Sequence, residues 1–165
     1  MDLYLVRHAT AFDPDPTQWP TDRERPLTPD GEKRFRRAAR GLVSLVSSVD
    51  VVLSSSYARA WRTAELLQAA GWPAPVKSEA LEAGRSPANV LQALQAYSSA
   101  ASVALVGHEP TMHELVSYLL TADSGHAQVD FGKGAVARLE VDGLRPGAAR
   151  LRWLLAPKVL RTIGR

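Results

Sequence analysis

Leu3-Tyr4-Leu5-Val6-Arg7-His8-Ala9-Thr10 is a run of apolar and β-favouring residues that ends in an arginine and a histidine. Its four leading residues suit a strand that is buried on both faces. Arg7 and His8 would then lie at the carboxyl end of this strand, where open α/β sheets place their ligand sites. A surface arginine beside a polar-capped histidine would explain the pair equally well, so the rest of the chain has to decide between the two.

Two further apolar runs also end in polar residues, which predicts two more buried strands. Val49 to Leu53 is followed by Ser54-Ser55-Ser56, and Ser102 to Val106 is followed by Gly107-His108. Amphipathic stretches between and after these runs predict helices. The expected helices run from the Thr28 cap to about Ser47, from about Tyr57 to Ala70, from the Ser86 cap onward, and from beyond Pro110 to about Thr121.

The last part of the chain has a different pattern. Ala135 to Val141 and Ala149 to Leu155 alternate between apolar and polar residues, with turn residues between them, so they predict an antiparallel pair. Strands that alternate with helices indicate an α/β layer fold, and this late hairpin makes its sheet mixed. We expect residues 1–165 to form a single domain, because 165 residues suit one core.

Composition narrows the functional classes. The chain is 45% hydrophobic and 22% charged, as in ordinary globular proteins, and it has no cysteine, which excludes cysteine-based phosphatase chemistry. We expect a cytoplasmic protein, because no stretch resembles a signal peptide or has membrane-spanning length. The net charge of +3 suits a phosphate site, whereas the basic residues lack the interleaved aromatic residues of a nucleic-acid surface.

The three strand ends carry the candidate chemistry. In a mostly parallel sheet the carboxyl ends of these strands lie along one edge, so Arg7, His8, Ser55, Arg59 and His108 are expected to converge there. Two histidines and two arginines at one point supply a nucleophile and a cationic cradle for a phosphoryl group. The segment from Ala11 to Pro26 has four prolines and no apolar period, and is expected to be a loop beside this site.

These motifs together resemble the histidine phosphatase superfamily. The resemblance rests on Arg7-His8-Ala9, on Leu53 to Ala60 with Thr63, and on Gly107-His108, with Ala9 where the family usually has glycine. Arg25-Pro26-Leu27-Thr28, Gly107-His108-Glu109-Pro110 and Leu155-Ala156-Pro157-Lys158 are similar to the SixA phosphohistidine phosphatases in particular. The resemblance implies a three-layer αβα, phosphoglycerate mutase-like fold whose mixed sheet is mostly parallel with a C-terminal antiparallel portion.

The resemblance also implies roles for individual residues. His8 would attack phosphorus and become transiently phosphorylated, while Arg7, Arg59 and His108 hold the phosphoryl oxygens. His8 would have to be neutral for this attack, whereas His108 would help most when protonated. Ser55 would either hydrogen-bond the phosphate or cap the helix after it. Glu82 is the candidate proton donor, with a solvated loop carboxylate as the alternative interpretation.

We therefore expect a monomeric phosphohistidine phosphatase that acts on proteins and needs neither a metal nor a cofactor. His108 and His113 are five residues apart rather than four, so they do not form the zinc pattern of one helical face. Two alternatives stay open. One is a phosphatase for small esters, nucleotides or sugar phosphates, and the other is a phosphate or phosphohistidine recognition module without turnover. No nucleic-acid or membrane partner is expected.

Overall fold

A computed structural model describes all residues from Met1 to Arg165. The strands are β1 Asp2–Arg7, β2 Val51–Ser54, β3 Pro75–Lys77, β4 Ser102–Gly107, β5 Val136–Val141 and β6 Ala149–Leu155. The α-helices are α1 Pro29–Leu45, α2 Ala58–Ala70, α3 Pro87–Leu94, α4 Thr111–Thr121 and α5 Pro157–Ile163. Three short 3-10 helices complete the chain, at Asp22–Glu24 (η1), Glu79–Leu81 (η2) and Gln95–Tyr97 (η3).

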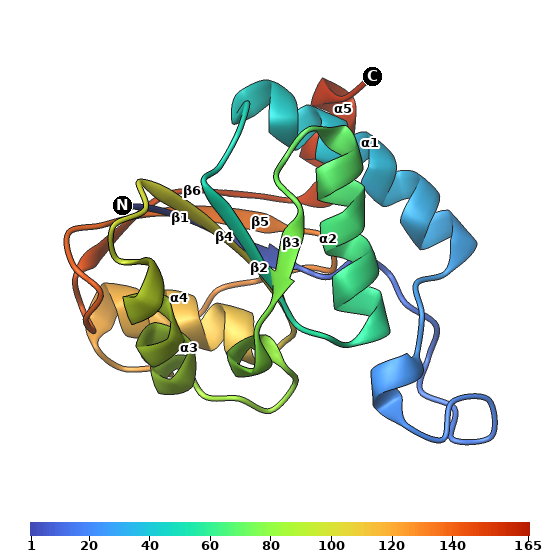
Figure 1. Cartoon of the computed structure of the whole chain (residues 1–165), viewed down its shortest axis with the longest axis horizontal. Helices are drawn as coiled ribbons and strands as arrows, with labels where there is room; N and C mark the ends of the chain where they lie inside the picture. Colours follow the sequence, from blue (N-terminus) through green and yellow to red (C-terminus); the bar gives the residue numbers. More distant parts are fainter.

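The six strands form one mixed sheet in the order β3-β2-β4-β1-β5-β6. β3, β2, β4 and β1 are parallel to one another, whereas β5 is antiparallel to β1 and β6 is antiparallel to β5. Helices α1, α2 and α5 cover one face, and α3 and α4 cover the other (Figure 1). The expected three-layer architecture with a mostly parallel sheet and a closing antiparallel pair is confirmed.

Two hydrophobic cores follow from the alternation of side chains along the central strand. Tyr4 and Val6 of β1 point into the core beneath α1, α2 and α5, whereas Leu3 and Leu5 point into the core beneath α3 and α4. These four side chains are 0–4% exposed. Because both faces of β1 are covered, its sequence is a continuous apolar run that ends at Arg7, the last residue of the strand, with His8 directly beyond it.

The caps predicted from sequence are present at several helix ends. The Thr28 hydroxyl accepts a hydrogen bond from Gly31 N at the start of α1, and Ser86 forms a capping box with Asn89 at the start of α3. Gly71 ends α2 with a φ of 128°, a conformation that favours glycine. α1 ends at Leu45, slightly before the expected end near Ser47, and Leu45 is 49% exposed.

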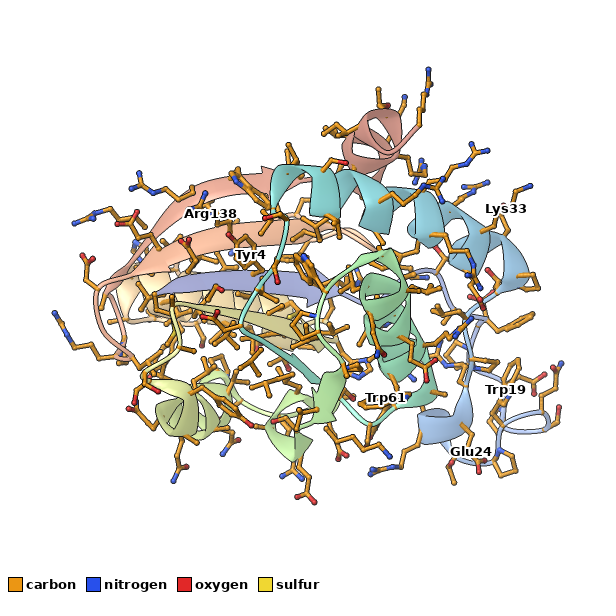
Figure 2. All side chains as sticks on the ribbon, turned by 45° about the horizontal axis from the view of Figure 1, so that its top comes forward. Tyr4, Trp19, Glu24, Lys33, Trp61 and Arg138 are labelled. Atoms are coloured by element: carbon orange, nitrogen blue, oxygen red, sulfur yellow. The ribbon has the colours of Figure 1, made fainter.

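The loop between β1 and α1 extends from the carboxyl edge of the sheet. It is held at its base by an isolated bridge between Ala11 and Leu27, and it contains η1. Figure 2 shows Trp19 and Glu24 on this loop, with Trp61 of α2 beside it. The predicted loop therefore has a short helical turn, and η1 faces the start of α2. None of the helices has the length and apolar character that crossing a bilayer requires.

Candidate active site

His8 leaves β1 at the carboxyl edge and is held in one orientation. Its backbone N–H donates to Gly107 O at 3.0 Å, and its Nδ1 lies 2.7 Å from the carbonyl oxygen of Ala9. A carbonyl oxygen only accepts, so Nδ1 carries the proton and Nε2 keeps its lone pair. The Ala9 N–H donates to Thr63 Oγ1 at 3.1 Å, which anchors the residue whose carbonyl orients the ring. The buried His8 ring thus offers Nε2 as a nucleophile.

His108 lies next to His8 at the end of β4. The two ring centroids are 5.1 Å apart, and the Tyr57 ring packs on His108 at the same distance. His108 Nε2 is 2.8 Å from Ser55 Oγ, and Ser55 Oγ accepts from Tyr57 N at 3.2 Å, so the Ser55 hydroxyl is free to donate to Nε2 of a neutral ring that carries its proton on Nδ1. Ser55 therefore supports both His108 and the start of α2. His108 Nδ1 is buried without a partner.

Arg59 projects from the first turn of α2 into the same region. Its side chain is 4% exposed, and its guanidinium lies 5.2 Å from the centre of the Tyr57 ring. NH1 donates to the backbone oxygen of Asp22, and NH2 donates to Asp22 Oδ2, each at 2.8 Å. These two bonds tie η1 to the start of α2 and leave Arg59 Nε free.

Arg7 completes the cationic group. Its NH1 donates to Phe131 O at 2.7 Å, and its Nε is buried without a partner. Arg7 Nε, Arg59 Nε and His108 Nδ1 are three of the four buried polar side-chain atoms that have no partner in the protein. Buried polar atoms are almost always paired, so unpaired nitrogens on these three residues indicate a place for an anionic ligand.

Burial and neighbouring arginines set the charge of both histidines. Burial lowers the pKa of His8 to about 3, with further lowering by Arg59 and Arg7. Burial also lowers the pKa of His108 to about 2, and repulsion from Arg59, and from His8 where that ring is protonated, lowers it further. Both rings are therefore neutral at pH 7 in the ligand-free protein. Neutral His8 agrees with the expected nucleophile, whereas a protonated His108, the form expected to help most in the reaction, is not favoured in the ligand-free protein.

Glu82 is not a solvated loop carboxylate. It is 6% exposed, its carboxylate accepts from Ser56 Oγ at 2.6 Å, and Arg23 bonds both of its oxygens at 2.7 and 3.3 Å. The Ser56 hydrogen bond, followed by those from Arg23, lowers the pKa of Glu82. This carboxylate is ionised at neutral pH, so it is poorly suited to donate a proton.

Sequence reasoning missed two charged residues of the site, Asp22 and Arg25. Asp22 accepts from Arg59 through Oδ2 and from Arg25 Nε through Oδ1, at 2.8 Å in each case. The positive charge of Arg25 contributes to lowering the pKa of both His8 and His108. Arg25 has a signal in the sequence, because it precedes the Thr28 cap by three residues, but Asp22 lies in a stretch without periodicity.

Comparison with known proteins agrees with this geometry. The sequence model of the histidine phosphatase superfamily (branch 1) matches residues 3–82. An uncharacterized protein of Picosynechococcus sp. is 34% identical over 155 residues, which cover 92% of this chain and 89% of that protein. An uncharacterized protein of Mycobacterium tuberculosis is 29% identical over 164 residues, covering 93% of this chain and all of that protein.

Solved structures extend the similarity to the whole fold. The structure of the protein histidine phosphatase SixA complexed with tungstate has a TM-score of 0.84 and 26% identity, and the match covers 97% of this chain and 99% of SixA. A protein assigned as SixA from Agrobacterium tumefaciens has a TM-score of 0.77 and 26% identity, over 94% of this chain and 98% of that one. An α-ribazole phosphatase from Shigella flexneri, at 17% identity, a TM-score of 0.70 and coverage of 95% and 97%, shares the fold.

Proposed function

This chain belongs to the histidine phosphatase superfamily and is a phosphatase with a histidine nucleophile, and we propose that it removes phosphate from phosphorylated histidine in proteins. Two kinds of support single out this substrate among those of the superfamily. One is the similarity to SixA along nearly the full chain. The other, which carries the proposal, is the charge state of the carboxylates beside the site.

In the proposed reaction, His8 Nε2 attacks phosphorus in line while the bond between phosphorus and the substrate's imidazole nitrogen breaks. The phosphoryl group is then bound to His8, and the released imidazole takes a proton from solvent. Water attacks the phosphorylated His8, so that inorganic phosphate leaves and Nε2 is free again. Arg7 Nε, Arg59 Nε and His108 Nδ1 bind the phosphoryl oxygens in both steps and stabilise the charge of each transition state.

Asp22 and Glu82 are the two carboxylates that bond to arginines of the loop and the site, and both are poor proton donors. Asp22 is bonded to Arg59 and Arg25, and Glu82 is bonded to Arg23 and Ser56. Hydrogen bonds and nearby arginines lower the pKa of both, against the opposing effect of burial. An alkoxide leaving group needs a proton from a positioned acid, whereas imidazole leaves more readily. Ionised carboxylates at these positions therefore favour phosphohistidine over a phosphate ester.

One observation favours the alternative of a small phosphate ester. The loop between β1 and α1 reaches the site, because Asp22 bonds Arg59 and Arg23 bonds Glu82. A loop in this position restricts the space for a large substrate. The two functions differ in their need for a proton donor, however, and Asp22, the loop carboxylate that bonds Arg59, has a pKa lowered by its hydrogen bonds to Arg25 and Arg59 against the effect of burial, so it is a poor donor to an alkoxide.

The test measures turnover of a phosphohistidine-bearing protein domain, phosphoserine and p-nitrophenyl phosphate by one phosphate-release assay, with and without chelator. We expect the highest kcat/KM on phosphohistidine, and loss of all turnover in His8→Ala. His126→Ala, in which an exposed histidine is removed, is the matched control and should keep full activity. Higher kcat/KM on an ester, or loss of activity with chelator, would contradict the proposal, and a single burst without turnover would indicate a binding module.

A further inference from the structure

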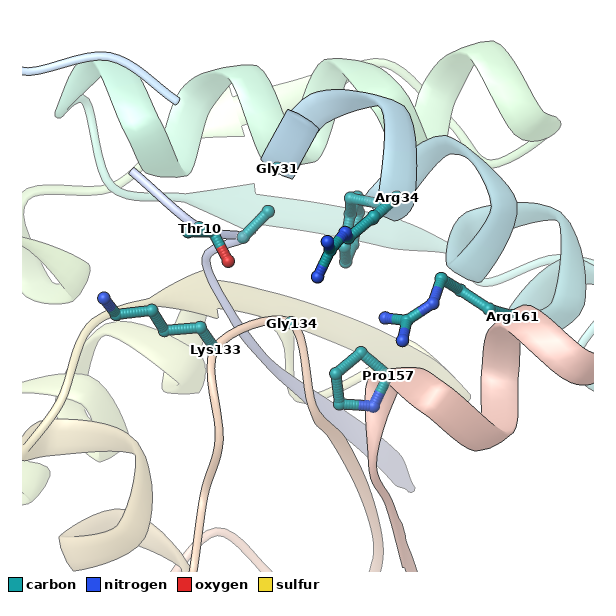
Figure 3. Close-up of a pocket in the computed structure, with 9 residues that line it drawn as sticks. Thr10, Gly31, Arg34, Lys133, Gly134, Pro157 and Arg161 are labelled. Carbon is teal, nitrogen blue, oxygen red and sulfur yellow. The ribbon is translucent and has the colours of Figure 1, made fainter. Parts of the chain in front are cut away.

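A cavity of about 250 Å³ lies beside the catalytic segment and takes no part in the reaction derived above. Thr10, Gly31, Arg34, Lys133, Pro157 and Arg161 contribute to its wall, and no acidic residue does. Figure 3 shows the guanidiniums of Arg34 from α1 and Arg161 from α5 on one side of the space, and Lys133 on the other side, with its ammonium group directed away from the two arginines. The charge of this cavity is uniformly positive.

A second cavity, of about 270 Å³, continues this surface along α1. It shares Arg34 and Arg161 with the first and adds Lys33, Arg37 and Asp30. Among the five basic side chains of the two cavities, only Arg34 has an acidic partner, Asp30 at 2.7 Å. We call Lys33, Arg34, Arg37, Lys133 and Arg161 the basic strip.

The basic strip lies at the same edge of the sheet as His8. The N–H of Gly134, next to Lys133, donates to the carbonyl oxygens of both Arg7 and His8 at 3.1 Å. β5 is antiparallel to β1, and β6 is antiparallel to β5, so the start of β5 and the end of β6 both lie at the carboxyl edge of β1. α5 begins there at Pro157. A protein placed over His8 therefore meets the basic strip as well.

We propose that the basic strip docks acidic side chains of the protein that carries the phosphohistidine. This inference rests on the function proposed above and specifies the charge of the partner. A single phosphate would occupy only one of the two cavities, whereas the five cations are spread over α1, α5 and the turn before β5. A protein surface with several carboxylates matches that spread. Because exposed ion pairs are individually weak, their contribution comes from several pairs acting together and from steering of the encounter.

Two phosphohistidine peptides of equal length test this inference, one with Asp and Glu around the phosphohistidine and the other with Asn and Gln. We expect the protein to show about tenfold higher kcat/KM on the acidic peptide, mainly through KM. The double variant Arg34→Gln with Arg161→Gln should lose this preference and keep its activity on N-phosphoimidazole. The control, Arg145→Gln with Arg150→Gln, removes the same charge at the opposite edge and should keep the preference.

The unphosphorylated acidic peptide provides a readout that does not depend on its turnover. It should inhibit hydrolysis of N-phosphoimidazole weakly in the unsubstituted protein and the control, and not in the double variant. Equal kcat/KM for the two phosphopeptides would overturn the docking inference while phosphohistidine hydrolysis stands. If neither phosphopeptide nor N-phosphoimidazole is hydrolysed but phosphoserine is, the proposed function fails, and the docking inference fails with it.

Discussion

The reactivity of His8 depends on a chain of three hydrogen bonds behind it. Thr63 Oγ1 donates to Arg59 O at 2.7 Å and accepts from Ala9 N, and the Ala9 carbonyl in turn accepts from His8 Nδ1. The same threonine thus connects the nucleophile to the backbone of the arginine that faces it. A free Nε2 and a fixed ring are both consequences of this connection, which spans β1 and α2.

The lowered pKa values of His8 and His108 predict how stability changes with pH. A histidine whose pKa falls on folding binds fewer protons in the native state, so acid favours the unfolded chain. The stability that depends on neutral His8 and His108 is fully present above the pKa of an unfolded histidine, about 6.5. It is lost as the pH falls toward the pKa values in the folded protein, about 3 for His8 and about 2 for His108. The free energy of unfolding should fall by about 1.4 kcal/mol per pH unit for each histidine across that range.

Urea unfolding at several pH values between neutrality and pH ~4 checks this slope. His108→Gln should show a shallower dependence than the unsubstituted protein, because one of the two groups no longer titrates. The control His126→Gln removes an exposed histidine and should leave the slope unchanged. Parallel curves for His108→Gln and the unsubstituted protein would show that His108 is not held neutral by the fold.

Asp22→Asn is expected to strengthen inhibition by inorganic phosphate. The Asp22 carboxylate partly neutralises Arg59 and Arg25, and asparagine would keep an acceptor oxygen without the negative charge. One more net positive charge beside the anion site should lower the inhibition constant for phosphate about threefold or more. Asp15→Asn, in the same loop but bonded to Thr17 and Gln18, is the control. An unchanged or higher constant would contradict this account of Asp22.

The site residues that could be identified from the sequence are those that follow a recognisable apolar strand or begin a helix. Arg7, His8 and His108 lie at the ends of apolar strands, and Arg59 lies in the first turn of a helix after such a strand, so their placement at one edge follows from a parallel sheet alone. Asp22 could not be found in this way. Its position depends on how a proline-rich loop folds back onto α2, and nothing in the spacing of that loop encodes the contact.

Helix α1 is positioned against the catalytic segment by a glycine. A Cβ at Gly31 would lie 2.2 Å from the carbonyl oxygen of Thr10, a distance that forces the helix and the segment apart. That same carbonyl accepts from Thr28 N at 3.0 Å, so the start of α1 is built directly on the residues after His8. The sequence predicted the Thr28 cap but not this close approach, because the approach involves backbone atoms of two separate elements.

Gly31→Ala should therefore destabilise the protein, although alanine favours an isolated helix by about 1 kcal/mol relative to glycine. We expect a loss of at least ~2 kcal/mol in the free energy of unfolding and a several-fold fall in kcat, because Thr10 and His8 would shift together. Denaturant unfolding and phosphate release measure the two effects. Ser44→Ala, at an exposed position of the same helix, should change neither by much, and a stabilised Gly31→Ala would refute the close contact.

The sheet order explains why a chain of this length can bring distant residues together. β4 lies between β1 and β2, so His108 at its end stands between His8 and Ser55, which sequence places far apart. The antiparallel addition of β5 and β6 then returns the chain to the same edge and places α5 against α1. Sequence predicted the parallel core and the hairpin. The basic strip was not predicted, because it forms only where α1, α5 and the turn at Lys133 meet.

This arrangement makes the reaction with a protein substrate sensitive to salt. Four of the five side chains of the basic strip are exposed and Arg161 is half-buried. The Debye length falls from about 14 Å at ~0.05 M to about 4 Å at ~0.5 M monovalent salt, so the attraction of the strip for carboxylates is screened over that range. In the proposed reaction Arg7 and Arg59 bind the phosphoryl group at contact distance through their buried Nε atoms, where salt screens much less. We therefore expect kcat/KM for an acidic phosphohistidine protein to fall about tenfold across the range, and that for N-phosphoimidazole to fall less than about threefold. Initial rates at matched pH measure both, and equal salt dependence for the two substrates would place the effect in the phosphoryl site instead.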